Sequence, residues 1–229
     1  MTIQSNTYLS LGTNQGNKLD NLQNAINLID DRIGAIEKIS SIYKTPSWGF
    51  EGEDFFNICL KVSTQQQTET LMKSLLKIEN DLGRLRSNED GYQNRHIDID
   101  ILLVNDEIIF SKIVTVPHSK MLQRNFVMIP LAEIAPNAIH PIEKTKISVC
   151  LLNCDDSSEV TLINDSLKRP TPIYEKYNYI AIEGNIGAGK TSLANLLSNE
   201  FNAKRVLERF ADNPFYQNSM KIMSDTLSH

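Results

Sequence analysis

The chain contains 229 residues with a formal net charge of −5 and a pI near 5.4, an acidic balance that disfavours nucleic acid as a main partner. A hydrophobic content of 41% with 22% charged residues supports a packed core and excludes wholesale disorder. No apolar run approaches the ~20 residues that cross a bilayer, and the polar N-terminal segment does not resemble a secretion signal.

Three cysteines are too few, and odd in number, for a disulfide framework, which indicates a reducing compartment. Cys150 and Cys154 lie four positions apart, but no second Cys or His pair accompanies them, so their spacing favours a structural role over a zinc site. We expect a cytoplasmic monomer that acts on small molecules and binds neither nucleic acid nor membrane.

Residues 8–82 alternate between strand and helix patterns. A short apolar strand at 8–11 precedes a turn-rich loop, and apolar residues then recur at helical spacing over 22–33 until Gly34. Residues 39–43 are expected to be extended, 56–62 alternate as in a half-buried strand, and 71–82 return to helical spacing.

Two further strands are predicted at 97–104 and 108–110, separated by the turn Asn105-Asp106. The order strand, helix, strand, strand, helix, strand is typical of the ferredoxin-like α+β fold, in which helices cover one face of an antiparallel sheet. Beyond Pro141 the periodic signal fades.

The composition divides the chain into three parts: a first domain over 1–160, a polar linker with two prolines over 161–178, and a second segment over 179–229. In the second segment, a short strand at 179–182 is expected to lead through a glycine-rich loop into a helix. Leu193, Leu196 and Leu197 lie on one face of that helix.

The strand at 97–104 carries two carboxylates. Because side chains alternate along a strand, Asp98 and Asp100 share one face while the neighbouring isoleucines point to the other. Two adjacent anions are costly when desolvated without a cation, and magnesium is commonly held by one or two carboxylates together with substrate phosphates. A solvated strand face, or an ion pair with Arg84, Arg86 or Arg95, explains the same dipeptide.

The surroundings favour the metal. The three arginines have planar guanidinium groups suited to phosphate oxygens, which predicts a metal–triphosphate site. Aromatic and amide side chains nearby would suit a flat heteroaromatic substrate; they are Trp48, Phe55, Tyr92 and Asn57.

These residues resemble the 6-hydroxymethyl-7,8-dihydropterin pyrophosphokinase family of folate synthesis over about residues 7–142. The resemblance rests on ordered motifs: Ser10-Leu11-Gly12-Thr13-Asn14, Ser41-Ile42-Tyr43-Lys44-Thr45-Pro46 with Gly49, Phe56-Asn57, Ile78-Glu79 with Gly83-Arg84-Leu85-Arg86, Arg95-His96-Ile97-Asp98-Ile99-Asp100-Ile101-Leu102, Val116-Pro117-His118 and Arg124-Asn125-Phe126. The family commonly has a second proline where this chain has Ser47, and Trp-Gly-Pro-Arg where it has Tyr92-Gln93-Asn94-Arg95.

The resemblance implies transfer of pyrophosphate from ATP to the pterin hydroxymethyl group, giving AMP and the pterin diphosphate. Asp98 and Asp100 would hold two magnesium ions, with Arg84 and Arg95 as further catalytic residues. The pterin pocket implied by the resemblance comprises Thr45, Pro46, Trp48, Phe55, Asn57, Tyr92 and Phe126, with the ring stacked between Phe55 and Phe126. The residues implied to face ATP are Glu79, Arg84, Arg86, Arg95, His118 and Arg124, although His118 is also explained as a turn residue after Pro117.

The second segment contains a Walker A motif at 184–191. Backbone amides from Gly184 to Gly189 would surround phosphates, Lys190 would reach the β and γ oxygens, and Thr191 would bind magnesium. Around it, the sequence resembles the N-terminal part of bacterial deoxynucleoside kinases, in which the position of Glu208 is the base for the sugar 5′ hydroxyl.

That resemblance covers 179–229 alone, and the family's downstream Asp-Arg motif, lid arginines and further strands are absent from it. A parallel α/β domain needs several strand–helix units to cover its sheet, so we expect no nucleoside kinase activity from this chain alone. The alternatives are a fragment of a bifunctional protein whose C-terminal part phosphorylates deoxynucleosides, or a nucleotide-binding module.

Overall fold

The computed structural model describes residues 5–47, 52–83, 95–171, 179–185, 187–201 and 203–207. The chain forms two compact units, Met1–Pro170 and Thr171–His229. Among the described residues, no helix is both long and apolar enough to cross a membrane.

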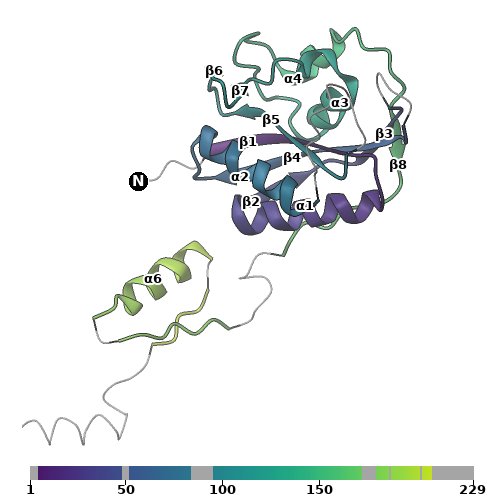
Figure 1. The fold of residues 1–229 in the computed structure, drawn as a ribbon. Coiled ribbons are helices and arrows are strands. Elements are labelled where there is room, and N and C mark those ends of the chain that lie inside the picture. Colours follow the sequence, from purple (N-terminus) through teal and green to yellow (C-terminus); the bar gives the residue numbers. More distant parts are fainter. Residues whose placement is uncertain are drawn as a thin grey trace, which may run out of the picture. The chain divides into compact units, whose positions relative to one another are not determined.

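Within the described residues, six strands of the first unit form one antiparallel sheet (Figure 1). The strands are β1 (Ser5–Thr13), β2 (Gly34–Ile39), β3 (Ile42–Thr45), β4 (Phe55–Thr64), β5 (Asp98–Val104) and β8 (Thr161–Ile163). Their order is β5-β1-β4-β3-β8, and β2 also pairs with β4. The order β5-β1-β4-β2 is that of a ferredoxin-like fold, so the predicted topology is confirmed.

One face of the sheet packs against α1 (Lys18–Arg32) and α2 (Thr68–Asp81), as the helical periodicity predicts. The side chain of Asn17 caps α1 by accepting a hydrogen bond from the Asp20 amide at 3.3 Å. The buried apolar residues of both helices meet those of the strands; in the helices they are Leu22, Ala25, Ile26, Ile29, Leu71, Leu75 and Ile78.

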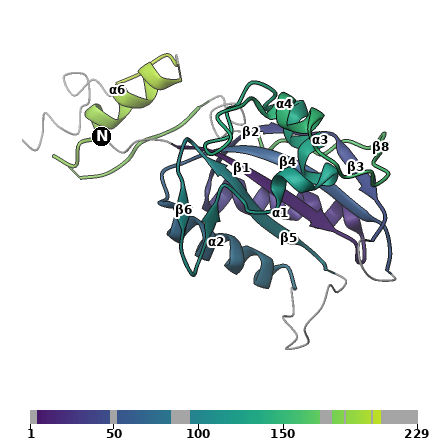
Figure 2. The same ribbon diagram turned by 90° about the horizontal axis from the view of Figure 1, so that it is seen from above.

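The opposite face of the sheet is also covered, and the expectation that helices lie on one face alone is wrong (Figures 1 and 2). Here lie the 3-10 turn η1 (Met121–Gln123), α3 (Asn125–Ile134) and α4 (Ile147–Leu152). Helix α3 was not predicted because it is apolar nearly all round and contains Pro130, so it has no helical alternation for the sequence to display.

A small hairpin adds a second sheet beside β5. Strand β6 (Ile109–Phe110) pairs with β7 (Thr115–Val116), in agreement with the extended segment predicted at 108–110. The hairpin leads into His118, whose backbone amide donates to the carbonyl of Leu102 on β5 at 3.0 Å. This bond brings the residues after β7 to the strand that carries the aspartates.

The first unit extends beyond residue 160. Strand β8, which falls in the segment expected to be a linker, pairs antiparallel with β3. Further along, the side chain of Gln23 on α1 hydrogen-bonds both the amide and the carbonyl of Lys168, at 2.8 and 2.9 Å. Strand β8 has only three residues, and its Leu162 is 54% exposed. The segment therefore has the polar composition that is typical of a linker.

The second unit contains α6 (Lys190–Glu200), which begins where the Walker A motif predicts a helix. Residues 179–182 form no strand, contrary to the expectation from their apolar sequence. Helix α6 has no buried residue, and Leu196 is 65% exposed. A strand needs a neighbour for its backbone hydrogen bonds, and the described residues of this unit supply none.

Candidate active site

The sheet register places three of the key residues side by side. Gly12 on β1 is paired with Asn57 on β4 and with Asp98 on β5. Neighbouring strands lie about 4.8 Å apart, so Asn57 and Asp98 are separated by about 10 Å across the sheet. A Cβ atom at Gly12 would lie 3.1 Å from the Asn57 side-chain oxygen, so glycine keeps this row open.

Asp98 and Asp100 lie on the same face of β5, as predicted, while the isoleucines between and beside them are buried in the core. Burial raises the pKa of Asp100, and the negative charge of Asp98 raises it further. His118, Arg124 and Arg95 act to lower the pKa of Asp100, but they do not offset these two effects. Two carboxylates with this electrostatic conflict favour a bound cation.

His118 and Arg124 lie close to the aspartates, His118 in the turn before η1 and Arg124 directly after it. Burial lowers the pKa of His118, although the charges of Asp100 and Asp98 act in the opposite direction. Its Nδ1 accepts the amide of Lys120 at 3.3 Å, which leaves Nε2 as the protonated nitrogen of a neutral ring. A residue that served only to form the turn after Pro117 would not need to lie among these charged groups.

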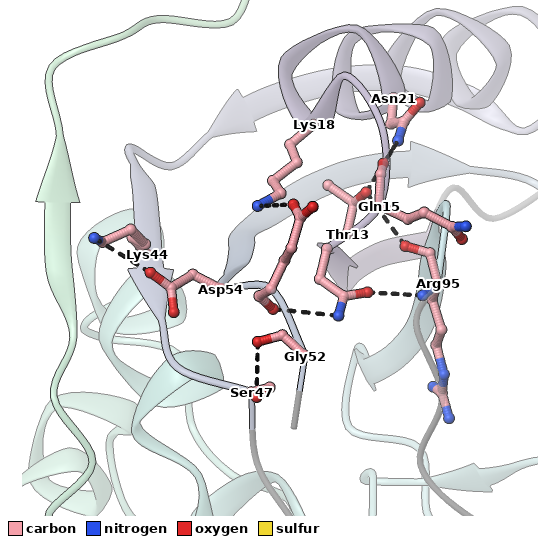
Figure 3. A network of polar contacts seen from close by, with 11 residues as sticks. Thr13, Gln15, Lys18, Asn21, Lys44, Ser47, Gly52, Asp54 and Arg95 are labelled. Atoms are coloured by element: carbon pink, nitrogen blue, oxygen red, sulfur yellow. Dashed lines mark hydrogen bonds and ion pairs between the residues drawn. The ribbon is translucent and has the colours of Figure 1, made fainter. Parts of the chain in front are cut away.

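Arg95 pairs with Asp98, which realises the ion pair considered from the sequence. The backbone of Arg95 is held by the turn after β1: its amide donates to Asn14 Oδ1 at 2.7 Å, and its carbonyl accepts the Asn14 amide at 3.1 Å. Thr13 and Asn21 extend this polar network (Figure 3). The network fixes Arg95 at the start of the strand that carries the acidic pair.

The same network reaches the segment that precedes β4. The Asn14 side-chain amide donates to the carbonyl of Glu53 at 3.3 Å, and Glu53 is paired with Lys18 at 2.9 Å. Asn14 is 1% exposed and connects the segment before β4 to the segment before β5. It was not among the predicted site residues, although it ends the motif Ser10-Leu11-Gly12-Thr13-Asn14.

Two of the residues expected around a flat substrate are bonded to one another. Asn57 Nδ2 donates to Thr45 Oγ1 at 3.0 Å, and both residues are buried. Phe55 is paired with Thr45 in the β3–β4 register, and Pro46 follows at the exposed end of β3. Phe126 lies in the first turn of α3, with the Arg124 guanidinium 5.5 Å from its ring centroid.

Glu79 has a different place from the one expected of an ATP-facing residue. It is 1% exposed, and its Oε1 accepts the amide of Ile99 at 2.7 Å. Since Ile99 stands between the two aspartates on the edge strand β5, this carboxylate holds the backbone that presents them. A carboxylate acceptor at a strand edge leaves no periodic signal in the sequence.

Several predicted residues lie outside the described residues; they are Trp48, Arg84, Arg86, Tyr92 and Glu208. Among the described residues, no group of three or more His, Cys, Asp or Glu could hold a metal. A magnesium ion at the acidic pair of β5 would therefore have at most two protein carboxylates, and its remaining oxygen ligands would come from phosphate and water.

In the second unit, the glycines of the Walker A segment adopt the backbone conformation that favours glycine: φ is +84° at Gly187 and +79° at Gly189. Lys190 Nζ donates to the carbonyl of Asn185 at 2.8 Å and to that of Gly184. Thr191 follows in the first turn of α6. The local backbone has the loop-to-helix character of the motif, but none of the residues of α6 is buried.

Comparison with known proteins agrees with the geometry of the first unit. Residues 8–136 match the family described as 7,8-dihydro-6-hydroxymethylpterin-pyrophosphokinase. The chain belongs to this family. It is a pyrophosphokinase of folate biosynthesis that acts on ATP and a pterin, and magnesium is expected for the family.

Two bacterial relatives are covered over most of their length. The 2-amino-4-hydroxy-6-hydroxymethyldihydropteridine pyrophosphokinase of Aquifex aeolicus is 41% identical over 136 residues, which is 59% of this chain and 83% of the relative. The enzyme of the same name from Porphyromonas gingivalis is 35% identical over 140 residues, which is 58% of this chain and 92% of the relative.

A solved structure shares the fold. The wild-type HPPK-DHPS structure from Plasmodium falciparum superposes with a TM-score of 0.55 at 16% identity. The match covers 67% of this chain and 45% of that one, so this chain spans less than half of the larger protein. The similarity supports the α+β arrangement of the first unit.

Proposed function

We propose that Asp98 and Asp100 bind two magnesium ions that receive the ATP triphosphate, and that this acidic face is where pyrophosphate is transferred to the pterin. The observation that carries the proposal is the convergence of His118, Arg124 and Arg95 on two adjacent carboxylates, one of them with a raised pKa. Bound magnesium would neutralise triphosphate charge and align its oxygens.

The pterin is proposed to lie beside this face, on the row that contains Asn57. Asn57 and Thr45 supply amide and hydroxyl groups for the edge of the heterocycle, with Pro46 at the pocket margin. Phe55 and Phe126 supply aromatic faces for the ring, as Trp48 and Tyr92 do in the sequence-based proposal. Asn57 is about 10 Å from Asp98 along this row, a separation that leaves room for the hydroxymethyl group and the β-phosphate.

Arginine side chains, together with the N–H group of the neutral His118 ring, are proposed to bind the phosphates of ATP. Arg95, Arg124 and His118 stand next to the acidic pair, and Arg84 and Arg86 are assigned to the phosphates by the sequence motif. The hydroxymethyl oxygen then attacks the β-phosphorus and releases its proton to water, while the bond from that phosphorus to the α-phosphate oxygen breaks and AMP leaves. Orientation and charge neutralisation provide the catalysis. The buried Glu79 is proposed to support β5, and contact with ATP is assigned to the partly exposed Arg95, His118 and Arg124.

The test is product identification by mass spectrometry after incubation with ATP, hydroxymethyl dihydropterin and magnesium, beside a sample treated with a chelator. AMP and the pterin diphosphate are expected with magnesium, with turnover lost on chelation and restored by added magnesium. ADP as the product, or turnover that is unaffected by chelation, would contradict the proposal.

For the second unit we propose a narrower role, phosphate contact by residues 184–191, supported by the motif and by the left-handed glycines that the loop contains. Isothermal titration of the whole chain with MgATP, before and after a Lys190→Ala substitution, tests it. Loss of one of two binding events is expected, and an identical isotherm would contradict this role. The proposal does not include Glu208 as a base for the 5′ hydroxyl of a deoxynucleoside.

A further inference from the structure

The first turn of α3 is capped by a residue that lies 31 positions further along the chain. Arg124, at the N-cap position, makes no side-chain capping bond. Instead, the amide of Asn125 donates to Asp156 Oδ2 at 2.7 Å, and the Asn125 side chain donates to the backbone carbonyl of Asp156. Since the first amides of a helix have no partner within it, Asp156 supplies the missing acceptor.

Asp156 is itself held in place. Its second carboxylate oxygen, Oδ1, accepts the amide of Ser158 at 2.9 Å and the Ser158 hydroxyl. Burial raises the pKa of Asp156, but the hydrogen bonds from Ser158 and Asn125 outweigh burial and lower it. The carboxylate is therefore charged at neutral pH, which is favourable beside a helix N-terminus.

The capped residue stands between two proposed site residues. Arg124 precedes Asn125 and faces Asp100, while Phe126 follows it and is proposed to stack on the pterin. Asp156, Arg124 and Phe126 line one pocket of about 500 Å³, whose remaining walls come from η1 and the residues after α4. Movement of Asp156 would thus displace the first turn of α3 at the point where it meets the site.

We propose that Asp156 is a positioning residue that orients the Phe126 ring for pterin binding through its bonds to Asn125. This inference rests on the proposed role of Phe126. Asp156 lies beyond residues 8–136, which match the family, so this chain supplies the support from a segment outside the matched region. The next two residues lead toward β8, whose pairing with β3 anchors the segment at its other end.

The test compares Asp156→Ala and Asp156→Asn with Asp155→Asn, which neutralises the neighbouring exposed carboxylate of the same pocket. The quantities measured are the KM for the pterin, the KM for MgATP, kcat and the melting temperature. We expect Asp156→Ala to raise the pterin KM by about tenfold, since a hydrogen bond to a charged group is lost. The ATP KM should rise less, because other cations share the phosphates. Asp156→Asn retains an acceptor and should show about a third of that rise, and Asp155→Asn none.

The double variant Asp156→Ala/Phe126→Ala separates positioning from general destabilisation. If Asp156 acts through Phe126, the double variant has the pterin KM of Phe126→Ala, whereas independent effects multiply. Multiplied effects, or equal rises in both KM values, would overturn the inference. If Asp156→Ala does not fold, an unchanged pterin KM in Asp156→Asn overturns it equally.

Phe126→Ala alone separates the proposed pterin site from the positioning role of Asp156. A raised pterin KM in Phe126→Ala with an unchanged one in both Asp156 variants overturns the positioning role and leaves the proposed pterin site intact. An unchanged pterin KM in Phe126→Ala overturns the proposed role of the ring and, with it, the inference.

Discussion

The chain carries two segments suited to phosphate chemistry, and they differ in what surrounds them. Strand β5 presents Asp98 and Asp100 from a sheet whose other face is closed by α1 and α2. Helix α6 follows the glycine-rich loop, but none of its residues is buried. A spacing motif identifies which atoms can contact a phosphate. Fixed backbone and buried support are needed to keep those atoms in place before the ligand arrives.

Removal of the acidic pair tests the role of the first segment directly. Asp98→Ala and Asp100→Ala should each reduce kcat/KM for AMP formation by at least about 10³-fold, because charge on the transferring phosphate is then left without its proposed metal. Steady-state assays of AMP release measure it, with Asp155→Asn as the matched carboxylate control. Activity within tenfold of wild type in either alanine variant would mean that the metal is held elsewhere.

The second prediction contrasts two leucines. Leu75→Ala should lower the free energy of unfolding by about 3 kcal/mol, since Leu75 is fully buried between α2 and the sheet. Leu196→Ala on α6 should change it by less than about 0.5 kcal/mol. Denaturant unfolding followed by circular dichroism measures both values. A large loss from Leu196→Ala would show that α6 packs against an apolar surface in solution.

The third prediction concerns the charge conflict on β5. The pKa of Asp100 is raised in the folded protein, so its contribution to stability is fully present below the unfolded pKa of about 3.9 and is lost as pH rises through the folded value. In metal-free protein at pH 7, Asp100→Asn should therefore raise the melting temperature by about 3 °C, and the gain should disappear near pH 3.5.

Magnesium provides the counterpart of that experiment. A cation that binds the folded state raises the melting temperature of the wild-type protein, and the rise should be smaller in Asp100→Asn. Thermal scans with and without magnesium measure both effects. A variant that is less stable than wild type at pH 7 without metal would contradict the assigned conflict between Asp98 and Asp100.

The smallest expected effect is that of Lys190→Ala on the pyrophosphokinase reaction. AMP formation should stay within about twofold of wild type, because Lys190 belongs to the second unit and is not among the residues proposed to act in the pyrophosphokinase reaction. The assay of the first prediction measures it. A large decrease would show that the Walker A segment takes part in the reaction of the first unit.

The sequence alone was sufficient to predict the strand and helix order up to β6, because the apolar residues of α1 and α2 recur with a 3.6-residue period and those of β4 with a 2-residue period. It also identified the aspartate pair, since alternation along a strand puts Asp98 and Asp100 on the same side. These local rules need no knowledge of distant contacts. The ordered motifs in the same residues agree with the family membership.

The contacts that hold this site in place are seen only in the tertiary structure. Helix α3 has no alternating pattern because it is apolar nearly all round. Glu79 on α2 and Asp156 after α4 reach their backbone partners, Ile99 and Asn125, across 20 and 31 positions of sequence. Such bonds depend on where chain segments meet after packing, and side-chain carboxylates that accept distant backbone amides leave no period or spacing for the sequence to show.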